Sequence, residues 1–556
     1  MLLEDLVALH GDLLAKGAAV APAGMAWRKV RGRLVIDRAG ALVAVVPGDF
    51  AGDEPEETLA PVAPVRSVNI AAALLCDTAA YLLGYSPKGD AKAPRKFEAA
   101  RDLHGTALRS VLEAAPVTAF FASWDPATAA SHPAVAESPV DLDAGFLEFS
   151  LMDDDGTLTD ILDMDGVRDA LSTGSAGDGG AFTDLVTGEP CEPLRIHPKA
   201  SALAGPGEKP APVVGCNMES GQSWGAAQGY LSPMAPATAG RYSAALDWLL
   251  KDGGHNLRLG EASFVWWAEG EADGAVSAAV EDALAGRGIA DVAEAASAAP
   301  LHVACLSSKY SRVQLRWYQT TTWGDAAASL TAWEGCFDGW LPSAFAILRA
   351  SERPGEKHPA TRCQDASSLV LALLMGGPWP RTLAQRAASS VALQGDVGHI
   401  PAGTLAAASL STRKESDVET DDLLSPEDPA YRAGCIFAIL EGLQKAALGH
   451  LAAPVRARFM AGAAKSPAKV MPALLGTAQA HLRKLSRLKP GLAAYYESTL
   501  SEAVAMGPVP LTMDAPASWR FYVGYYRQRD ELYRSRGGFG EAPENAPDET
   551  PEDPAG

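Results

Sequence analysis

The sequence predicts an α+β fold, in which a mixed N-terminal region with antiparallel hairpins is followed by an all-helical C-terminal bundle. Two observations predict it. Before residue 323, short runs of alternating apolar residues are joined by Gly-containing turns, as in β-hairpins. After Trp323 such runs nearly vanish, and segments with helical periodicity follow one another, separated by Pro and Gly. With 556 residues, 47% of them apolar, the chain is long enough for several folded domains.

The N-terminal elements follow in order. Residues 1–17 predict an amphipathic helix and not a signal peptide, because acidic residues interrupt the apolar pattern. The sequence pattern predicts a hairpin at residues 33–46, a short helix at residues 69–85 and a basic loop at residues 86–101. Residues 145–162 predict a second hairpin, whose DDDG turn lacks the spacing of a calcium-binding loop.

The middle and C-terminal elements change from strands to helices. We expect a strand at 212–217, a helix at 241–252, a hairpin at 254–269, and strands at 301–308 and 312–321. The helical segments beyond them are 323–336, 341–352, 365–377, 381–395, 429–449, 453–466, 467–488 and 491–507. Four parts result: an α+β domain at 1–330, a helical connection at 331–424, a helical bundle at 425–537, and an acidic tail at 538–556 too rich in Pro and Glu to fold.

Composition bounds the partners and the compartment. Seven scattered cysteines without a C-x-x-C pair argue against a disulfide framework and a zinc ribbon, and favour a reducing cytoplasm. No apolar run approaches the roughly 18 residues of a membrane span, so we expect no membrane partner. The net charge is −21, yet residues 451–490 hold eight Lys and Arg without one Asp or Glu. An acidic chain can therefore still present a basic face to nucleic acid.

One motif suggests an enzyme. Residues 221–225, GQSWG, fit the G-x-S-x-G pattern of a serine hydrolase, with Ser223 as nucleophile. That motif needs a strand of a parallel sheet before it and a long helix directly after it. The sequence predicts no long helix after Gly225, and it predicts upstream strands in antiparallel hairpins. Asp252, His255 and His302 could be named as the other members of a catalytic triad with Ser223. Their presence is uninformative, because a chain this long always contains Asp and His residues downstream of a serine.

Other catalytic or metal motifs are absent from the sequence. Cys191 and His197 lie six residues apart, but without further ligands or an orienting group nearby. We therefore expect no catalytic residue, no metal and no cofactor. A serine or Cys/His hydrolase stays the alternative.

One series of segments between the N-terminus and about Tyr533 is distinctive when it is taken in order: DLVTGEPCEPLRIHPKA, CNMESGQSWGAAQGYLSPMAPATAGRYSAALDWLL, RLGEASFVWWAEG, GGPWPRTL, SPEDPAYRAGCIFAILEGLQKAALG and RFMAGAAKSPAKVMPALLGTAQAHLRKL. Together these segments resemble a known family, the Cascade large subunit of subtype I-C CRISPR systems (Dvulg-type). The ordered series is far more specific than any one segment.

The resemblance implies a non-catalytic subunit of a surveillance complex guided by crRNA. Such a subunit recognises the protospacer-adjacent motif (PAM) in target double-stranded DNA, assists duplex opening and R-loop formation, and helps recruit a separate helicase-nuclease. The implied partners are the backbone and crRNA-processing subunits, the small subunit and the target DNA. Guide pairing supplies sequence specificity, so the protein reads only a few base pairs.

Three groups of residues are candidate DNA contacts. The first group consists of polar residues among glycines, namely Asn217, Ser220, Gln222, Ser223 and Gln228. These side chains are suited to contacts with base edges or phosphates. Alternatively, they belong to an ordinary polar loop without a ligand. The second group consists of the cations of the basic loop, namely Lys88, Lys92, Arg95 and Lys96, with Asn69 nearby in sequence. Either these side chains contact the phosphates of duplex DNA, or the loop is simply solvated.

The third group lies in the C-terminal bundle, which in the family resembles the small subunit and lines the path of the displaced strand. Arg483, Lys484 and Arg487 fall within one helical turn and project together. Nearby aromatic residues either stack on bases or, more commonly, pack in the core: Tyr495, Tyr496, Phe521, Tyr522, Tyr525 and Tyr526.

The family also often makes this C-terminal piece separately, from an internal start. No Met lies between Met375 and Met460, so a product beginning near residue 425 needs a non-Met codon, at Val418 or Leu423 for example. A start at Met460 deletes the first helix of the bundle.

Overall fold

The computed structural model describes residues 1–51, 54–64, 66, 70–173, 182–200, 203, 210–215, 219–223, 225–309, 312–352, 363–394, 397–412, 423–449 and 454–537. The chain divides into two compact units. The N-terminal unit is Met1–Asn256 with Leu306–Leu315, and the C-terminal unit is Leu257–Cys305 with Arg316–Gly556. The four-part division expected from the sequence stays a prediction, and the tail at 538–556 lies outside the described residues.

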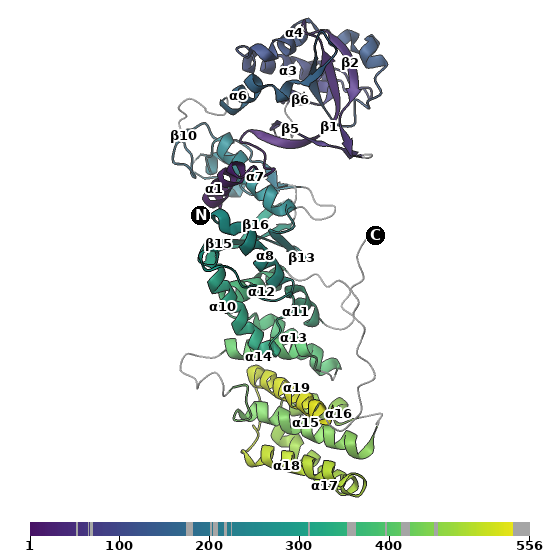
Figure 1. Cartoon of the computed structure of the whole chain (residues 1–556), viewed down its shortest axis with the longest axis vertical. Coiled ribbons are helices and arrows are strands. Elements are labelled where there is room, and N and C mark those ends of the chain that lie inside the picture. The colour runs from purple at the N-terminus through teal and green to yellow at the C-terminus, as the bar shows by residue number, and fades with distance from the viewer. Residues whose placement is uncertain are drawn as a thin grey trace. The chain divides into compact units, whose positions relative to one another are not determined.

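Two hairpins build the main sheet of the N-terminal unit, and both were predicted. Strand β1 (Met25–Ile36) pairs antiparallel with β2 (Leu42–Pro47), and β7 (Phe146–Met152) pairs antiparallel with β8 (Leu158–Asp160). The sequence did not reveal that β1 and β7 run parallel, which joins the hairpins into one sheet of order β2-β1-β7-β6. Parallel neighbours need a long crossover, and the helical segment between the hairpins supplies it (Figure 1).

The helices of that crossover cover the sheet through an aromatic core. The rings of Phe120 and Phe149 lie 5.4 Å apart, and those of Phe97 and Phe121 also 5.4 Å apart. The elements between the two hairpins are β3 (Phe50–Ala51), β4 (Glu54–Pro55), β5 (Glu57–Pro61), β6 (Cys76–Asp77), α2 (Ala79–Leu82), α3 (Ala93–Ala107), α4 (Ala115–Ser123) and α5 (Pro133–Ala136). Helix α6 (Asp165–Thr173) follows β8.

Two expectations about this segment were wrong. The helix predicted at 69–85 is only the four residues of α2, preceded by strand β6. The loop predicted at 86–101 ends early, because α3 begins at Ala93 and buries Phe97 and Ala100. Pro94, which indicated a loop, is instead tolerated in the first helical turn, where a missing N–H costs nothing.

The rest of the N-terminal unit consists of two packed helices and short strands. The predicted helices are confirmed as α1 (Leu2–Ala15) and α7 (Pro236–Lys251), which pack against each other. The strand predicted at 212–217 is shorter, since β12 is Ala211–Pro212 and its partner β11 is Lys199–Ala200. Strands β9 (Phe182–Thr183) and β10 (Pro190–Cys191) form another small hairpin.

From Asn256 the chain forms a four-stranded sheet and then continues in helices, so the predicted α+β class is confirmed. The predicted strands are β13 (Asn256–Leu259), β14 (Ala262–Ala268), β15 (Pro300–Lys309) and β16 (Arg312–Thr322), in that order. The helices are α8 (Asp273–Leu284), α9 (Glu294–Ser297), α10 (Trp323–Glu334), α11 (Ala344–Ala350), α12 (Cys363–Met375), α13 (Arg381–Gln394), α14 (His399–Ser411), α15 (Pro429–Leu448), α16 (Val455–Ala463), α17 (Pro467–Leu488), α18 (Pro490–Ala505) and α19 (Ala515–Gly537).

The sequence missed α14 and α19, which pack against each other. Helix α19 also lies along α15 (Figure 1), and together these contacts place α15 and α19 at the centre of the bundle. No helix within the described ranges is both long and apolar enough to cross a bilayer.

Candidate nucleic-acid interface

The segment around Ser223 is a compact turn. A 3₁₀ turn at Glu219–Gly221 is followed by a single β-bridge between Ser223 and Ala226, with Gly225 at φ = 73°. The first three candidates of this segment, Ser220, Gln222 and Ser223, have exposed side chains. Asn217 lies outside the described residues. The exposed hydroxyls and amide are available to a ligand in solution.

Gln228 is held at the end of this turn by an arginine that the sequence did not single out. Gln228 adopts φ = 55°, and its Oε1 accepts a hydrogen bond of 2.9 Å from Nη1 of Arg195. The next residue, Gly229, donates its N–H to the Arg195 carbonyl oxygen at 2.9 Å. A Cβ at Gly229 would lie 2.0 Å from the Leu194 carbonyl oxygen, so only glycine fits. Backbone and side-chain contacts thus fix an exposed guanidinium beside an amide.

No local signal identified Arg195. It stands alone in a turn-rich stretch, 33 residues before Gln228, and only the folded chain brings the two together.

The surroundings of Ser223 differ from those of a hydrolase nucleophile. Among the described residues, a 3₁₀ turn precedes it, and another, Gln228–Leu231, follows it. The Cys191 thiol is buried, and burial raises its pKa, which disfavours the reactive thiolate. Nδ1 of His197 lies 2.9 Å from the Tyr242 hydroxyl, and burial lowers the pKa of this imidazole.

The other nominal partners are also packed. The His255 ring lies edge-on to Trp248 at 4.7 Å, and Nε2 of His302 lies 3.1 Å from Oε1 of Glu269. In the part of the chain that the structure describes, no three His, Cys, Asp or Glu side chains are arranged to hold a metal ion.

The cations of the second group gather where α3 begins. The side chains of Lys88, Lys92 and Arg95 are exposed, and none forms an ion pair with another described residue. Lys96 differs, because its Nζ lies 2.5 Å from Oδ2 of Asp90. Three cations of this group are therefore exposed without an ion pair to a described residue, and the fourth is paired with Asp90.

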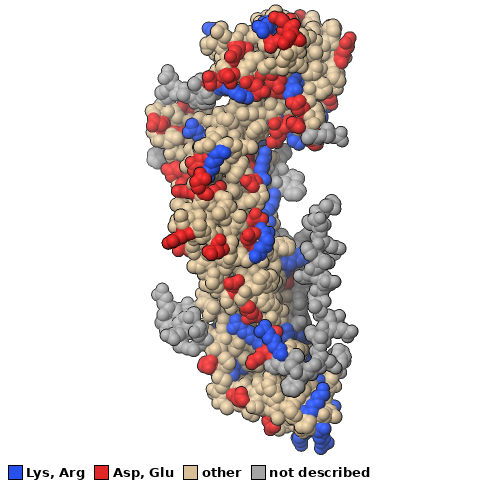
Figure 2. All heavy atoms as spheres, viewed as in Figure 1, with Lys and Arg blue, Asp and Glu red and all other residues tan. Residues whose placement is uncertain are grey.

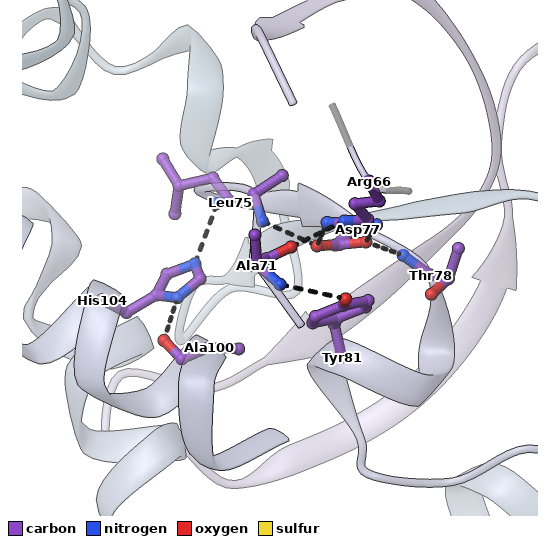
Figure 3. A network of polar contacts seen from close by, with 9 residues as sticks. Arg66, Ala71, Leu75, Asp77, Thr78, Tyr81, Ala100 and His104 are labelled. Atoms are coloured by element: carbon purple, nitrogen blue, oxygen red, sulfur yellow. Dashed lines mark hydrogen bonds and ion pairs between the residues drawn. The ribbon is translucent and has the colours of Figure 1, made fainter. Parts of the chain in front are cut away.

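A polar network supports this cluster from the neighbouring loop (Figure 3). The Arg66 guanidinium binds both oxygens of buried Asp77 and lies 4.0 Å above the Tyr81 ring. Nζ of Lys96 lies 5.3 Å from the same ring. Asp77 also accepts the N–H of Ala73 at 2.7 Å, so the chain before α2 is fixed at several points.

The same network holds Leu75 in the left-handed conformation, at φ = 61°. Its N–H donates to Nε2 of His104 at 2.9 Å, and Nδ1 of that ring lies 2.6 Å from the Ala100 carbonyl oxygen. Asn69 lies outside the described residues.

Helix α17 carries the third group. Arg483, Lys484 and Arg487 are exposed, and Nε of Arg483 donates to the Gln479 carbonyl oxygen at 3.2 Å. In the face shown in Figure 2, Lys and Arg side chains gather at the lower end of the view, where α17 lies in Figure 1. The helix sequence contains no acidic residue, so its C-terminal end, where these three cations lie, carries only positive charge of its own.

Most of the six aromatic candidates near α17 pack in the core. Packing was the more common of the two roles considered for them, the other being stacking on bases. Four of them are buried, namely Tyr496, Phe521, Tyr522 and Tyr525. Tyr495 is 37% exposed, and Tyr526 is half-buried. Of these six residues, Tyr495 therefore offers the most exposed ring to a base.

Comparison with known proteins agrees with the resemblance drawn from the sequence. Residues 6–533 match the family described as CRISPR-associated protein (Cas_Csd1). No curated protein matches the chain. Because the family match spans nearly the whole chain, the protein belongs to the CRISPR-associated Csd1 family, consistent with the type I-C Cascade large subunit that its sequence resembles.

Proposed function

We propose that this Cascade component recognises the PAM in target double-stranded DNA, without catalysing a reaction, and so starts duplex opening and R-loop formation. The observation that carries the proposal is the exposed pair of Arg195 and Gln228. Arg donates two parallel hydrogen bonds to guanine, and Gln both donates to and accepts from adenine, which makes these the side chains most suited to reading base edges in the major groove.

The geometry of the pair supports base reading over a purely structural role. Because Oε1 of Gln228 already accepts from Arg195, its amide N–H groups are directed away from that contact. The backbone contact between Gly229 and Arg195 limits the motion of both side chains, which lowers the entropy lost on binding. The exposed hydroxyls of Ser220 and Ser223 suit the flanking phosphates.

The two cationic groups supply affinity without sequence preference. Lys88, Lys92 and Arg95 would contact duplex phosphates, and the α17 face would follow the displaced strand. The partners in this proposal are the crRNA, the backbone and crRNA-processing subunits, the small subunit and the helicase-nuclease, all in the cytoplasm.

The test uses Cascade assembled with variant chains and duplexes that carry randomised flanking motifs. Arg195→Ala is expected to weaken binding to the preferred motif by about 1–3 kcal/mol and to flatten discrimination at one base pair. Gln228→Ala is expected to do the same at the same or a neighbouring base pair. Arg109→Ala is the control, because Arg109 is an exposed arginine of the same unit outside the candidate groups. Unchanged discrimination in both interface variants would refute the proposed reading site.

Ser223→Ala separates this proposal from the hydrolase alternative. We expect DNA binding to be partly retained, because Ser223 is one contact among several. A loss of turnover on an ester substrate that the unmodified chain hydrolyses would favour the hydrolase instead.

A further inference from the structure

Four cations gather at the C-terminal end of α17. Arg483, Lys484 and Arg487 lie in the last turns of the helix, and Lys489 follows it directly. All four side chains are exposed, and none forms an ion pair with another described residue. We call these four residues the α17 cations.

Like charges at this spacing repel one another. Arg483 and Arg487 stand four residues apart, and Lys484 and Arg487 three apart, so the members of each pair are neighbours on the helix surface. Such pairs destabilise a helix, and α17 contains no acidic residue to offset them. The α17 cations therefore attract negative charge from outside their own helix.

The chain carries such negative charge beyond the end of α19. Residues 538–556 contain no Lys, Arg or His and six carboxylates, namely Glu541, Glu544, Asp548, Glu549, Glu552 and Asp553. This acidic tail lies outside the described residues. Its carboxylates outnumber the four α17 cations.

The tail begins on the same helical bundle as the α17 cations. Helix α19 ends at Gly537, and near that end the Tyr533 hydroxyl lies 3.1 Å from Nζ of Lys445 in α15. Helix α15 also packs on α17. The 19 residues of the tail span up to about 60 Å when extended, whereas the 22 residues of α17 are about 33 Å long. The tail is therefore long enough to reach α17 from the end of α19.

Attachment makes even a weak attraction effective. A linked segment meets its site at an effective concentration in the millimolar range. The attraction is electrostatic, because the tail offers six carboxylates and only one large apolar side chain, Phe539, and salt therefore weakens it. Single-stranded DNA is a polyanion that binds the same kind of surface, so the tail and DNA compete for the α17 cations.

We propose that the acidic tail occupies the α17 cations in the free protein and that single-stranded DNA displaces it. The tail thereby acts as an autoinhibitory polyanion, which limits unspecific binding of single strands to α17. The displacement rests on the proposed function, since it takes the α17 face as the path of the displaced strand. The contact between the tail and α17 does not depend on that path.

The first test locates the tail by carbodiimide cross-linking of the full-length chain, which joins a carboxylate to a neighbouring lysine amine. Mass spectrometry then identifies the joined residues. We expect the tail to be joined to Lys484 and Lys489 in preference to Lys445, which lies beside the end of α19 and is the control for proximity. The double substitution Arg483→Gln with Arg487→Gln keeps both lysines and should reduce these cross-links about fivefold, as expected for two lost exposed ion pairs. Arg109→Gln in the N-terminal unit is the matched control and should leave them unchanged.

The second test measures the competition with DNA. A tail variant replaces the six carboxylates by the matching amides, from Glu541→Gln to Asp553→Asn, and keeps the length of the tail. We expect this variant to bind a twenty-nucleotide single strand about fivefold more tightly than the unmodified chain at about 0.05 M salt. The difference should vanish at about 0.5 M salt, where screening removes the attraction of the tail.

The outcomes separate the tail contact from the proposed function. Cross-links that favour Lys445, or that spread evenly over the exposed lysines, would overturn the contact. Equal strand affinities of the two chains at low salt would overturn the autoinhibition. The proposed path of the displaced strand fails separately, if Arg483→Gln with Arg487→Gln leaves strand binding by the tail variant unchanged.

Discussion

At the scale of single residues, Glu148 in β7 is a buried carboxylate of the main sheet. Its side chain is 1% exposed, and Oε1 lies 3.3 Å from Nε of Arg33, while Oε2 has no hydrogen-bond partner among the described residues. The same Nε lies 3.1 Å from Oδ1 of Asp160, so two carboxylates share this one nitrogen, while Asp49 pairs with the terminal nitrogens of the same guanidinium. Burial, and then the charge of Asp160, raises the pKa of Glu148 from 4.5 to about 7.

This raised pKa has a consequence for stability. Between pH 4.5 and 7 the folded state binds more protons than the unfolded state, so this group makes the protein less stable as pH rises through that range. Glu148→Gln removes the effect. The stability of the variant relative to the unmodified chain is therefore expected to increase between pH 5 and 8, by at most about 3 kcal/mol. Thermal unfolding at several pH values measures this, and a difference independent of pH would contradict it.

A second prediction concerns the cations at α3. If Lys92 and Arg95 both contact phosphate, neutralising both should reduce the salt slope of Cascade binding to duplex DNA by about two. Lys96→Gln is the internal control, because Asp90 already compensates Lys96, and its slope should stay near that of the unmodified complex. Affinities at several salt concentrations give the slopes. Equal slopes for all three proteins would mean that Lys92 and Arg95 do not touch the DNA backbone.

At the scale of elements, α15 and α19 approach each other through glycines on both helices. A Cβ at Gly434 would lie 2.0 Å from the Phe521 carbonyl oxygen, and one at Gly524 would lie 2.2 Å from the Tyr431 carbonyl oxygen. Backbone therefore contacts backbone at this crossing, which gives the two helices their extensive packing. Neither glycine breaks its helix, because close packing outweighs the weak intrinsic preference against glycine.

The crossing predicts opposite effects for two Gly→Ala substitutions. Helix propensity alone predicts that each alanine stabilises by up to about 1 kcal/mol. Gly434→Ala should instead destabilise the bundle by about 3 kcal/mol or more, because it forces the helices apart. Gly476→Ala in α17 is the control, since nothing lies within 4 Å of its Cβ, and it should be neutral or stabilising. Chemical unfolding of both variants decides, and equal stabilities would show that the crossing adapts to a methyl group.

At the scale of the whole molecule, charge is distributed unevenly. The chain carries a net charge of −21, yet the last turns of α17 carry Arg483, Lys484 and Arg487 in a helix without an acidic residue, and exposed cations lie at or just before the start of α3. Local potential and not net charge decides whether a polyanion binds, because charges beyond about 8–10 Å are screened at physiological salt. The net charge is thus compatible with the DNA binding proposed here.

The bundle also sets limits on a separately made C-terminal product. Asp428 caps α15 by accepting the N–H groups of Ala430 and Tyr431, and its Oδ1 lies 3.2 Å from Nε of Arg520 in α19. A product starting at Met460 begins inside α16 and lacks α15, the helix that packs on α16, α17, α18 and α19.

We therefore expect any stable product to begin before Asp428. Mass spectrometry of the purified complex gives its first residue. A stable fragment starting at Met460 would contradict the structural argument, and full-length chain alone would show that no internal start is used.

The sequence by itself determined the family, the α+β class, both N-terminal hairpins and most helices of the second half. Hairpins and amphipathic helices are specified by neighbours in sequence, so Gly turns and apolar periodicity reveal them. The cationic groups Lys88–Lys96 and Arg483–Arg487 could be predicted for the same reason, because their members are neighbours in sequence. Only the tertiary structure decided what depends on distant residues: the parallel pairing of β1 with β7, the pairing of Arg195 with Gln228 and the compensation of Lys96. No local pattern encodes these contacts, because each forms only when packing brings separate elements together.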